Sequence, residues 1–528
     1  MPSPSQRSRI LFSGGGIPYL IRDEFDDVRA AGAVNGTPPT PGPGGNRTVV
    51  DTDGNKMSIG GGELAYAPKG VITTGDPGLW ESSVDRVAGR VLLSHYKSSV
   101  LGSTDFDFDT NPSAAPVEGL RTSAVLTTVD AGVGISTGQP ILNGVDYFLG
   151  ISLRIVGAYK FIKGGIYLQW TLVWIGNTGS ATPLFAAIAN RDSTAVSRFL
   201  RVADSYIPVP FAYDTFGRGN GALGSSENIG PDGQAVAVLP WTGATWTIVT
   251  NKAVNTPVPG ADVIINGGFG ADTDWNKGAN QTIAAGKLTG ASATSDTVAT
   301  VPPLTVGVWY QSTFTQTGFG AGTIRMVLGT SANAGHTANS TFTEVARAVF
   351  SGAFTIRAQG GWIGSVDDVL VKPLTLSELF ASVNPAASAD VHARVSITLS
   401  GQFNNLPAGL VLNLDNAVTP LNFILAYLDG KGQCILDECV NGVYTNKIAG
   451  AITYSAGALL YVIRRGNSCF VYYNSIQVGT VQTMTPNTNR LFGMFGPSPL
   501  NQLDQFEVTP DGLGGYHSEL DRLLGSSA

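Results

Sequence analysis

The sequence of 528 residues contains only three cysteines, and all of them, Cys434, Cys439 and Cys469, fall in one short region. An odd number of cysteines without a CxxC pair builds neither a disulfide framework nor a zinc site of that spacing. We therefore expect the chain to fold in a reducing compartment. The four histidines are scattered, and none belongs to the HExxH pattern of a zinc enzyme.

Charged residues are scarce as well, at 13% of the chain, against roughly 25% in an ordinary soluble protein. The formal net charge is −7 and no Lys/Arg cluster is present, so a nucleic-acid partner, which needs a basic surface, is not expected. No apolar run reaches the roughly 20 residues of a membrane span. Stretches rich in Ala, Leu, Glu and Lys with a 3.6-residue period are also missing, which excludes long helices.

The amino-terminal segment, residues 1–20, lacks the apolar core of a signal peptide, because only Ile10, Leu11 and Phe12 follow one another as apolar residues. Its glycines at 14–16 favour a flexible tether. A protein built of β modules of the extracellular type, but without a signal peptide or disulfide bonds, matches what a phage product released by cell lysis would show.

Glycine, by contrast, is abundant at 67 residues, and it separates strand-length apolar runs. Residues 458–480 alternate such runs with Gly, Asn and Ser turns, which is the pattern of an antiparallel meander. Residues 165–177 have the same texture, and a helical pattern is confined to 376–381 and 518–524. We therefore predict an all-β fold of tandem antiparallel β-sandwiches of the jelly-roll kind.

A weak internal repeat indicates the module boundaries. Three opening stretches lead to Phe25, Phe216 and Phe269, each followed by an Ile-containing strand. The complete short unit 262–373 lies between the opening at Asp214 and a long strand set without an opening of its own, so one module is predicted to be inserted within another. The predicted parts are an N-terminal tether (1–20), a first β-sandwich (21–212) and a concanavalin-like β-sandwich in two pieces (213–257 with 375–510). An inserted jelly roll (262–373) and a C-terminal tail (511–528) complete the chain.

Four motifs of the inserted unit resemble those of carbohydrate-binding modules with a galactose-binding-like jelly roll. They are Ile-Asn-Gly-Gly-Phe at 265–269, Asp-Trp at 274–275, Ile-Ala-Ala-Gly-Lys at 283–287 and Val-Asp-Asp-Val at 366–369. The resemblance implies glycan binding and a structural calcium ion near the opening motif and the closing Asp368. Gly270 stands where such modules have a calcium-binding Glu.

Five motifs in the flanking parts resemble the concanavalin/laminin-G-like sandwiches of bacteriophage minor structural and tail-fibre proteins. They are Asp-Thr-Phe-Gly-Arg-Gly-Asn-Gly-Ala-Leu-Gly at 214–224, Ala-Gly-Leu-Val-Leu at 408–412, Ala-Tyr-Leu-Asp-Gly at 426–430, Tyr-Tyr-Asn at 472–474 and Asp-Gln-Phe at 504–506. The resemblance implies a virion protein that folds in the host cytoplasm, contacts other virion proteins and forms a homo-oligomer.

Exposed aromatic rings are the side chains on which sugars stack, and the inserted unit holds three of the eight tryptophans. Trp309, Tyr310 and Trp362 are therefore the candidate ligand-binding residues, whereas Trp275, beside the opening strand, is expected to be structural. Core packing is the alternative, since most tryptophans of a sandwich are buried.

Calcium is the one cofactor that the sequence allows. In a strand, Asp105, Asp107 and Asp109 would place three carboxylates on one face, and Ca²⁺ binds several such oxygens. A solvated strand face above a core face is the alternative. Asp368 is the fourth metal candidate.

No catalytic constellation is visible. Glycoside hydrolysis needs two carboxylates that face one sugar, and here Asp and Glu occur as single residues in turns; a Gly-x-Ser-x-Gly elbow is absent. We predict a non-enzymatic component of a bacteriophage virion, on the tail or capsid surface, whose sandwiches contact other subunits and host-surface glycans. A secreted bacterial lectin or adhesin and a glycan-cleaving enzyme with an accessory binding module are the alternatives.

Overall fold

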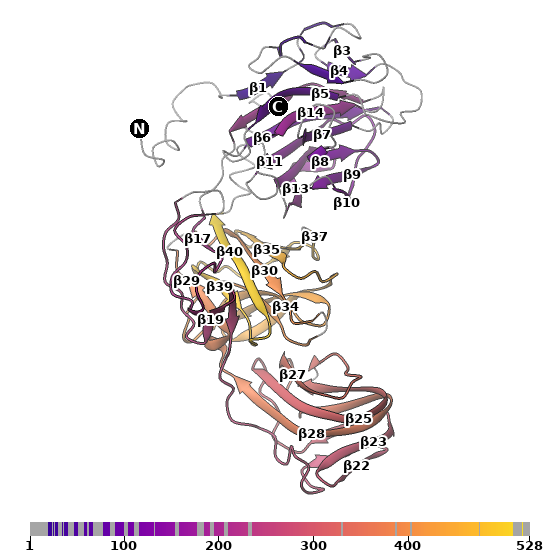
Figure 1. Cartoon of the computed structure of the whole chain (residues 1–528), viewed down its shortest axis with the longest axis vertical. Helices are drawn as coiled ribbons and strands as arrows, with labels where there is room; N and C mark the ends of the chain where they lie inside the picture. The colour runs from indigo at the N-terminus through magenta and orange to yellow at the C-terminus, as the bar shows by residue number, and fades with distance from the viewer. Residues whose placement is uncertain are drawn as a thin grey trace. The chain divides into compact units, whose positions relative to one another are not determined.

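The computed structural model of the chain consists almost entirely of β-strands (Figure 1). It describes residues 210–510 except 231–234, 329–330, 386–387, 402–403 and 475, and it also describes Leu520. Before residue 205 it describes 19–204 apart from 24, 26, 30–33, 35, 41–46, 51–56, 61–62, 67–77, 85–89, 100–103, 110–115, 131–132, 154–157, 177–183 and 191–194. The predicted all-β class with several antiparallel sheets is confirmed.

The chain divides into two compact units, Met1–Pro208 with Gly512–Ala528 and Val209–Asp511. The strands of the first unit are β1 (Tyr19–Asp23), β2 (Thr48–Val50), β3 (Met57–Gly60), β4 (Glu63–Tyr66), β5 (Gly78–Val84), β6 (Arg90–Ser98), β7 (Thr104–Asp109), β8 (Pro116–Thr122), β9 (Val125–Asp130), β10 (Val133–Pro140), β11 (Tyr147–Leu153), β12 (Ala158–Gly164), β13 (Tyr167–Ile175), β14 (Leu184–Asn190), β15 (Ala195–Ser197) and β16 (Leu200–Asp204).

These strands form a first sandwich of two antiparallel sheets. The nine-stranded sheet runs β13-β12-β11-β6-β15-β4-β3, with β16 on β6 and β1 on β16, and the seven-stranded sheet runs β10-β9-β8-β7-β14-β5-β2. Leu92 and Leu149 of one sheet share a buried apolar cluster with Phe106 and Ile188 of the other. The alternation of side chains along each strand thus supplies the core from both sheets.

The second unit contains a second sandwich in two pieces. Its ten-stranded sheet is built from β17 (Ala212–Asp214), β18 (Gly221–Ala222), β19 (Trp246–Val249), β20 (Lys252–Asn255), β30 (Val391–Thr398), β35 (Ala458–Arg465), β36 (Ser468–Tyr473), β37 (Ile476–Gln477), β38 (Gln482–Thr483) and β40 (Gln502–Pro510). Its six-stranded sheet has the order β29 (Phe380–Val383), β39 (Leu491–Phe495), β31 (Ala408–Leu414), β32 (Phe423–Leu428), β33 (Gln433–Val440) and β34 (Val443–Ala451).

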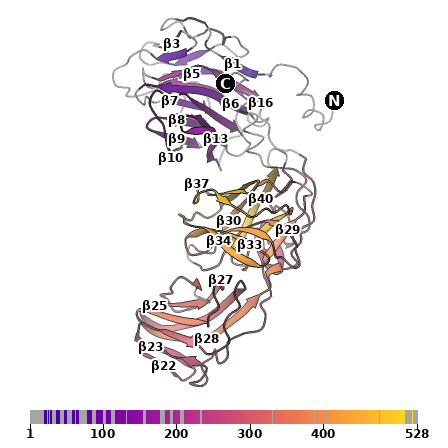
Figure 2. The ribbon, with the colours of Figure 1, turned by 180° about the vertical axis from the view of Figure 1, so that it is seen from behind.

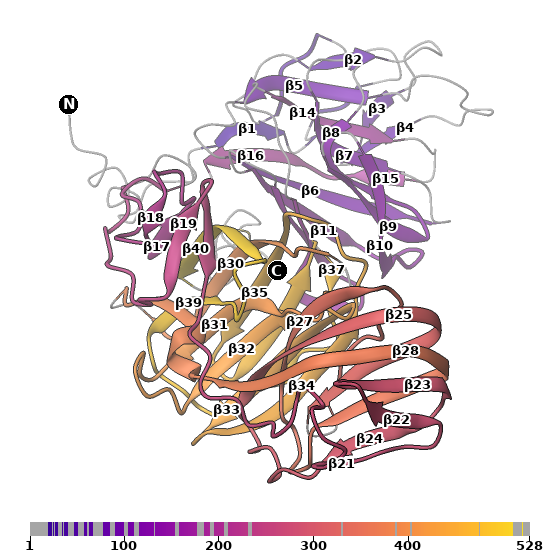
Figure 3. The same ribbon diagram turned by 60° about the horizontal axis from the view of Figure 1, so that its bottom comes forward.

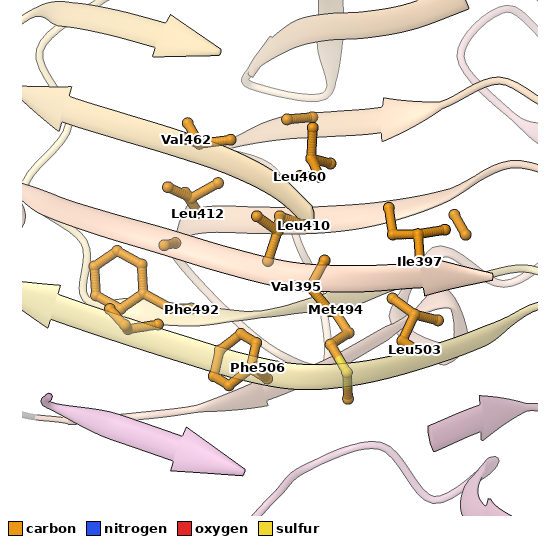
Figure 4. Close-up of a cluster of buried hydrophobic side chains, with 14 of the residues drawn as sticks. Val395, Ile397, Leu410, Leu412, Leu460, Val462, Phe492, Met494, Leu503 and Phe506 are labelled. Atoms are coloured by element: carbon orange, nitrogen blue, oxygen red, sulfur yellow. The ribbon is translucent and has the colours of Figure 1, made fainter. Parts of the chain in front are cut away.

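The core of the second sandwich lies between these two sheets (Figure 4). Val395, Leu460 and Phe506 come from the ten-stranded sheet, and Leu412 and Met494 come from the six-stranded sheet. All five side chains are fully buried. Trp246 and Ile248 of β19 belong to the same buried cluster, so strands from before residue 256 and after residue 379 share one core.

Between β20 and β29 the chain forms an inserted module with a sheet of its own. Its strands are β21 (Trp275–Asn276), β22 (Gln281–Ala284), β23 (Lys287–Ala293), β24 (Asp296–Ala299), β25 (Trp309–Leu328), β26 (Ser331–Ala332), β27 (Ser340–Arg347) and β28 (Thr355–Leu374). The long strands β25 and β28 run side by side (Figure 3). The entering and leaving chains are hydrogen-bonded where they cross, Gly260 N to Pro373 O at 2.8 Å.

The three opening stretches share a local backbone conformation. Phe25, Phe216 and Phe269 have φ values of 53°, 53° and 49°, a left-handed conformation that is uncommon for a bulky residue. All three rings are buried. At Phe216 the conformation is fixed by the amide, which donates to Asp214 Oδ1 at 2.8 Å.

Helical structure among the described residues is confined to short pieces. The prediction for 376–381 is confirmed by a 3-10 helix, η1 (Leu376–Leu379). Of the predicted C-terminal tail and its helix only Leu520 is described; it is helical and buried, and it packs over Gly150 next to Trp170. The predicted tether lies outside the described residues up to position 18, after which β1 begins. None of the described helical residues forms a segment long and apolar enough to cross a membrane.

Candidate functional site

Two of the predicted ligand-binding rings lie in the core of the inserted module. Trp362 is fully buried and Tyr310 is 4% exposed. The Trp362 ring packs over Gly290, where an added Cβ would collide with it at 2.3 Å, and beside Gly364, where an added Cβ would lie 3.2 Å away. Rings in this position contact protein on all sides, so they do not offer a face to a sugar.

The third predicted ring, Trp309, packs on the second sandwich. Its ring centroid lies 5.0 Å from that of Phe495 and 5.8 Å from that of Tyr427, both on the six-stranded sheet. The indole Nε1 donates to the hydroxyl of Tyr444 at 3.4 Å. Trp309 is thus a contact between modules, which corrects its assignment to a solvent-exposed binding face. The physical reason is that the outer face of the neighbouring sheet covers it.

Among the tryptophans whose burial the structure gives, Trp241 alone is half-exposed. Its Nε1 donates to Asp214 Oδ2 at 2.7 Å, and its ring packs on Phe506 at 5.0 Å between centroids. These contacts fix the ring at the border of the second core.

The calcium candidates are only partly described. Asp105, Asp107 and Asp109 lie on β7, as the strand prediction requires, and Phe106 between them is buried; their own side chains lie outside the described residues. Asp368 is exposed, has a φ of 53°, and its amide donates to Asp367 Oδ1 at 2.8 Å. Across the described part of the chain, no three His, Cys, Asp or Glu side chains gather as metal ligands do.

A pocket of about 230 Å³ lies where β32 begins and β33 ends in the six-stranded sheet. Three separate segments form it, and the third is the loop that precedes β39. Its lining consists of Asn422, Phe423, Ile424, Glu438, Cys439, Val440, Thr485, Pro486, Asn487, Thr488 and Asn489. Amide and hydroxyl groups dominate its walls. Phe423 and Ile424 also belong to the lining, but their side chains are buried in the cores on the two faces of the sheet.

Glu438 is the only charged side chain in the lining of this pocket. One of its carboxylate oxygens accepts a hydrogen bond from the amide of Thr485, and the other lies 3.0 Å from Lys447 Nζ. The side chain is 7% exposed. Because each carboxylate oxygen can accept two hydrogen bonds, Glu438 keeps acceptor capacity for a ligand hydroxyl.

Asparagine side chains hold the pocket loop in place. Asn487 Nδ2 donates to Asn413 O at 2.9 Å, and Asn413 Nδ2 donates in turn to Asn489 O at 2.7 Å. The Asn489 amide closes this set by donating to Asn487 Oδ1 at 2.9 Å. The loop is therefore fixed to β31 before any ligand arrives, which lowers the entropic cost of binding.

Asn422, on the opposite wall, is oriented by Asp415. Its Nδ2 donates to Asp415 Oδ2 at 2.7 Å, and its Oδ1 accepts from the amide of Asn441 at 2.9 Å. Burial raises the pKa of Asp415, but hydrogen bonds from Leu421 and Asn422 outweigh burial and leave the pKa below its ordinary value. The carboxylate therefore stays ionised at neutral pH and keeps Asn422 in one orientation.

The strand that carries Glu438 also joins the inserted module. Asp437, the preceding residue of β33, points to the other side of the sheet, where it meets Arg347 of β27. Figure 2 labels the two strands, β33 and β27. Asp437 also accepts hydrogen bonds from Tyr427 OH at 3.1 Å and Asn446 Nδ2 at 3.0 Å. Alternating residues of one strand thus serve the module contact and the pocket.

Sequence reasoning found none of the pocket residues. The only signal was the turn-rich stretch Thr-Pro-Asn-Thr-Asn at 485–489, and such stretches are common in loops. The pocket exists because the ends of the paired strands β32 and β33 meet the loop before β39 at one end of a sheet.

No family model and no curated protein matches the sequence. Among solved structures, the chain matches carbohydrate-binding module CBM66 from Bacillus subtilis with 16% identity over 26% of this chain and 86% of that one, at a TM-score of 0.20. It matches a glycosyl hydrolase family protein from Mycobacterium fortuitum with 14% identity over 35% of this chain and 100% of that one, at a TM-score of 0.24. Domains LG4-5 of the mouse laminin α1 chain match with 8% identity over 94% of this chain and 89% of that one, at a TM-score of 0.17.

The named structural neighbours are thus β-sandwich proteins that are carbohydrate-binding modules, glycosyl hydrolases or laminin domains. Further matches are a putative β-glucanase, a κ-carrageenase and a xylan β-1,4-xylosidase. These matches contradict the prediction that the protein is not an enzyme, since glycosyl hydrolases are the majority among them, and we withdraw it. None of these structural neighbours is a phage protein, so the assignment to a virion stays a prediction.

Proposed function

We propose that the protein binds glycans, and that the pocket beside Glu438 holds one sugar unit. The observation that supports this proposal is the chemistry of the lining, in which fixed amides, hydroxyls and one carboxylate surround a small cavity. A sugar presents hydroxyl groups at its edge and C–H groups on its ring faces. The polar walls suit the hydroxyls, and Val440 and Pro486 of the lining offer apolar groups to the C–H side.

Binding at one pocket is expected to be weak, because each sugar hydroxyl exchanges a hydrogen bond with water for one with protein. A homo-oligomer, which the sequence analysis expects, would present several pockets together. Effective concentration would then raise the avidity by about 10²–10⁴. The proposal therefore concerns a surface with many copies of a weak site.

The experiment is a glycan array with the full chain, followed by titration of the best glycan with single variants. Glu438→Gln should weaken binding by about threefold to tenfold, the effect of one hydrogen bond. Asn487→Ala should also weaken binding, because it releases the pocket loop from Asn413. Asn228→Ala, at an exposed asparagine outside the lining, is the matched control and should bind like the wild type. Absence of glycan binding, or binding that both pocket variants leave unchanged, would sink the proposal.

We further propose that the chain is a component of a bacteriophage particle, where glycan binding would serve attachment to a host surface. The support is the low charge, the resemblance of the 214–224 and 504–506 motifs to tail-fibre proteins, and three buried cysteines without disulfides. Mass spectrometry of purified particles, with light scattering of the isolated chain, tests this proposal. Absence of the protein from the purified particles would contradict this proposal. The alternative is a secreted lectin, which would then be found as free protein in the culture medium.

A further inference from the structure

Apolar side chains border the polar pocket on its outer side. Val440 lines the pocket, and Val443 is its direct partner in the antiparallel pair of β33 and β34. Directly opposed residues of such a pair point to the same side of the sheet. Val443 therefore extends the pocket face outward, and it is 69% exposed.

The loop on the other side of the pocket adds a second apolar group. Pro486 is exposed and belongs to the lining. Single exposed apolar residues are normal on protein surfaces. These residues differ because Val440 and Pro486 line one polar cavity and Val443 lies directly opposite Val440. A ligand in this cavity can place an apolar substituent against them.

We infer that the pocket prefers sugars that carry an acetyl group, with the acetyl methyl against Val440, Val443 and Pro486. This inference rests on the glycan-binding function proposed above. The size of the patch favours an acetyl group over a long acyl chain, because three small side chains cover one methyl group but not a chain of many carbons. The sugar hydroxyls remain with Glu438 and the asparagines.

The magnitude of the preference follows from the burial of one methyl group, which is worth about fourfold in affinity. Val443→Thr keeps the branched shape of the side chain and replaces one methyl with a hydroxyl. The variant should lose part of this preference, about twofold in affinity for acetylated sugars, and nothing for sugars without the group. Val238→Thr, at a valine 57% exposed in a loop outside the pocket lining, should change neither.

The experiment is titration of the full chain with N-acetylglucosamine and glucose, and with an O-acetylated polysaccharide before and after mild alkaline removal of its O-acetyl groups. Stronger binding of the acetylated member, reduced in Val443→Thr, supports the inference. A preference for N-acetylglucosamine over glucose alone means that the pocket recognises an N-acetyl group. A preference for the O-acetylated over the deacetylated polysaccharide alone means that it recognises an O-acetyl group. Equal binding of both members in both pairs overturns the acetyl preference and leaves glycan binding intact, whereas no binding of any probe overturns both proposals.

Discussion

Arg347 of the inserted module and Asp437 of the second sandwich form a buried ion pair, with 2.7 Å between Nη2 and Oδ2 and side-chain exposures of 11% and 0%. The guanidinium also lies over the Tyr444 ring, 4.0 Å from its centroid. Asp437→Ala should lower the free energy of unfolding by about 3–5 kcal/mol, because it leaves a buried cation unpaired. Chemical denaturation measures the change.

The matched control is the pair Arg357–Asp296, which has the same residue types at 3.0 Å but exposures of 37% and 34%. Arg357→Ala should cost less than about 1 kcal/mol, since water screens the pair. Similar losses of unfolding free energy in the two variants would contradict the structure, in which the Asp437 contact is shielded from water.

Independent folding of the inserted module stays a prediction, and the structure adds a cost to it. Removing residues 261–373 with a short Gly/Ser joint uncovers the side of the six-stranded sheet where Tyr427 and Phe495 meet Trp309. The remainder should fold cooperatively but bind a hydrophobic dye more strongly than the full chain does. An insoluble remainder, beside two soluble halves cut at residue 374, would instead indicate modules in series.

Acid should weaken the first sandwich through Asp27. Burial raises the pKa of Asp27, but hydrogen bonds from Arg47, Arg29 and Thr40 outweigh burial and hold the pKa well below its ordinary value. A depressed carboxyl pKa contributes stability above the unfolded-state value of about 3.9 and loses it as the pH falls toward the folded-state value. The stability difference between wild type and Asp27→Asn should therefore shrink below about pH 4. A difference that stays constant down to pH 2 in thermal unfolding would contradict this account.

The three thiols should be inert in the folded protein. Burial raises the pKa of Cys434 and Cys469 to about 12 and that of Cys439 to about 11. The thiolate is the reactive form, so Ellman's reagent at pH 8 should titrate almost no thiol in the native chain and three thiols in denaturant. Fast reaction of any native thiol would place that cysteine at the surface.

Close strand packing makes Gly493 sensitive to substitution. A Cβ at this position of β39 would lie 1.8 Å from the carbonyl oxygen of Ala381 on the neighbouring strand β29. Gly493→Ala should therefore cost about 1–3 kcal/mol, the usual range for overpacking. Gly268→Ala, where no atom lies within 4 Å of the added carbon, should change the stability by less than about 0.5 kcal/mol. Equal effects in urea denaturation would refute the close packing.

Local patterns decided much of the fold. Strand-length apolar runs between Gly and Asn turns predicted an all-β chain, because the period of two along a strand is a property of each segment by itself. The openings at Phe25, Phe216 and Phe269 could be found for the same reason, since one local backbone conformation recurs at each. The short helix at Leu376–Leu379 was also visible in its own residues.

Which side chains would be exposed depended on the tertiary structure. Trp309 and Trp362 look alike in sequence, yet one packs on a neighbouring sheet and the other fills the core of its own module. An aromatic residue on a strand becomes a ligand platform or a core residue according to what covers that strand face. The covering residue can lie far along the chain, as Phe495 does from Trp309. The pocket beside Glu438 has the same origin: the ends of β32 and β33 meet the loop before β39 only in the folded sandwich, so no single stretch of sequence contained it.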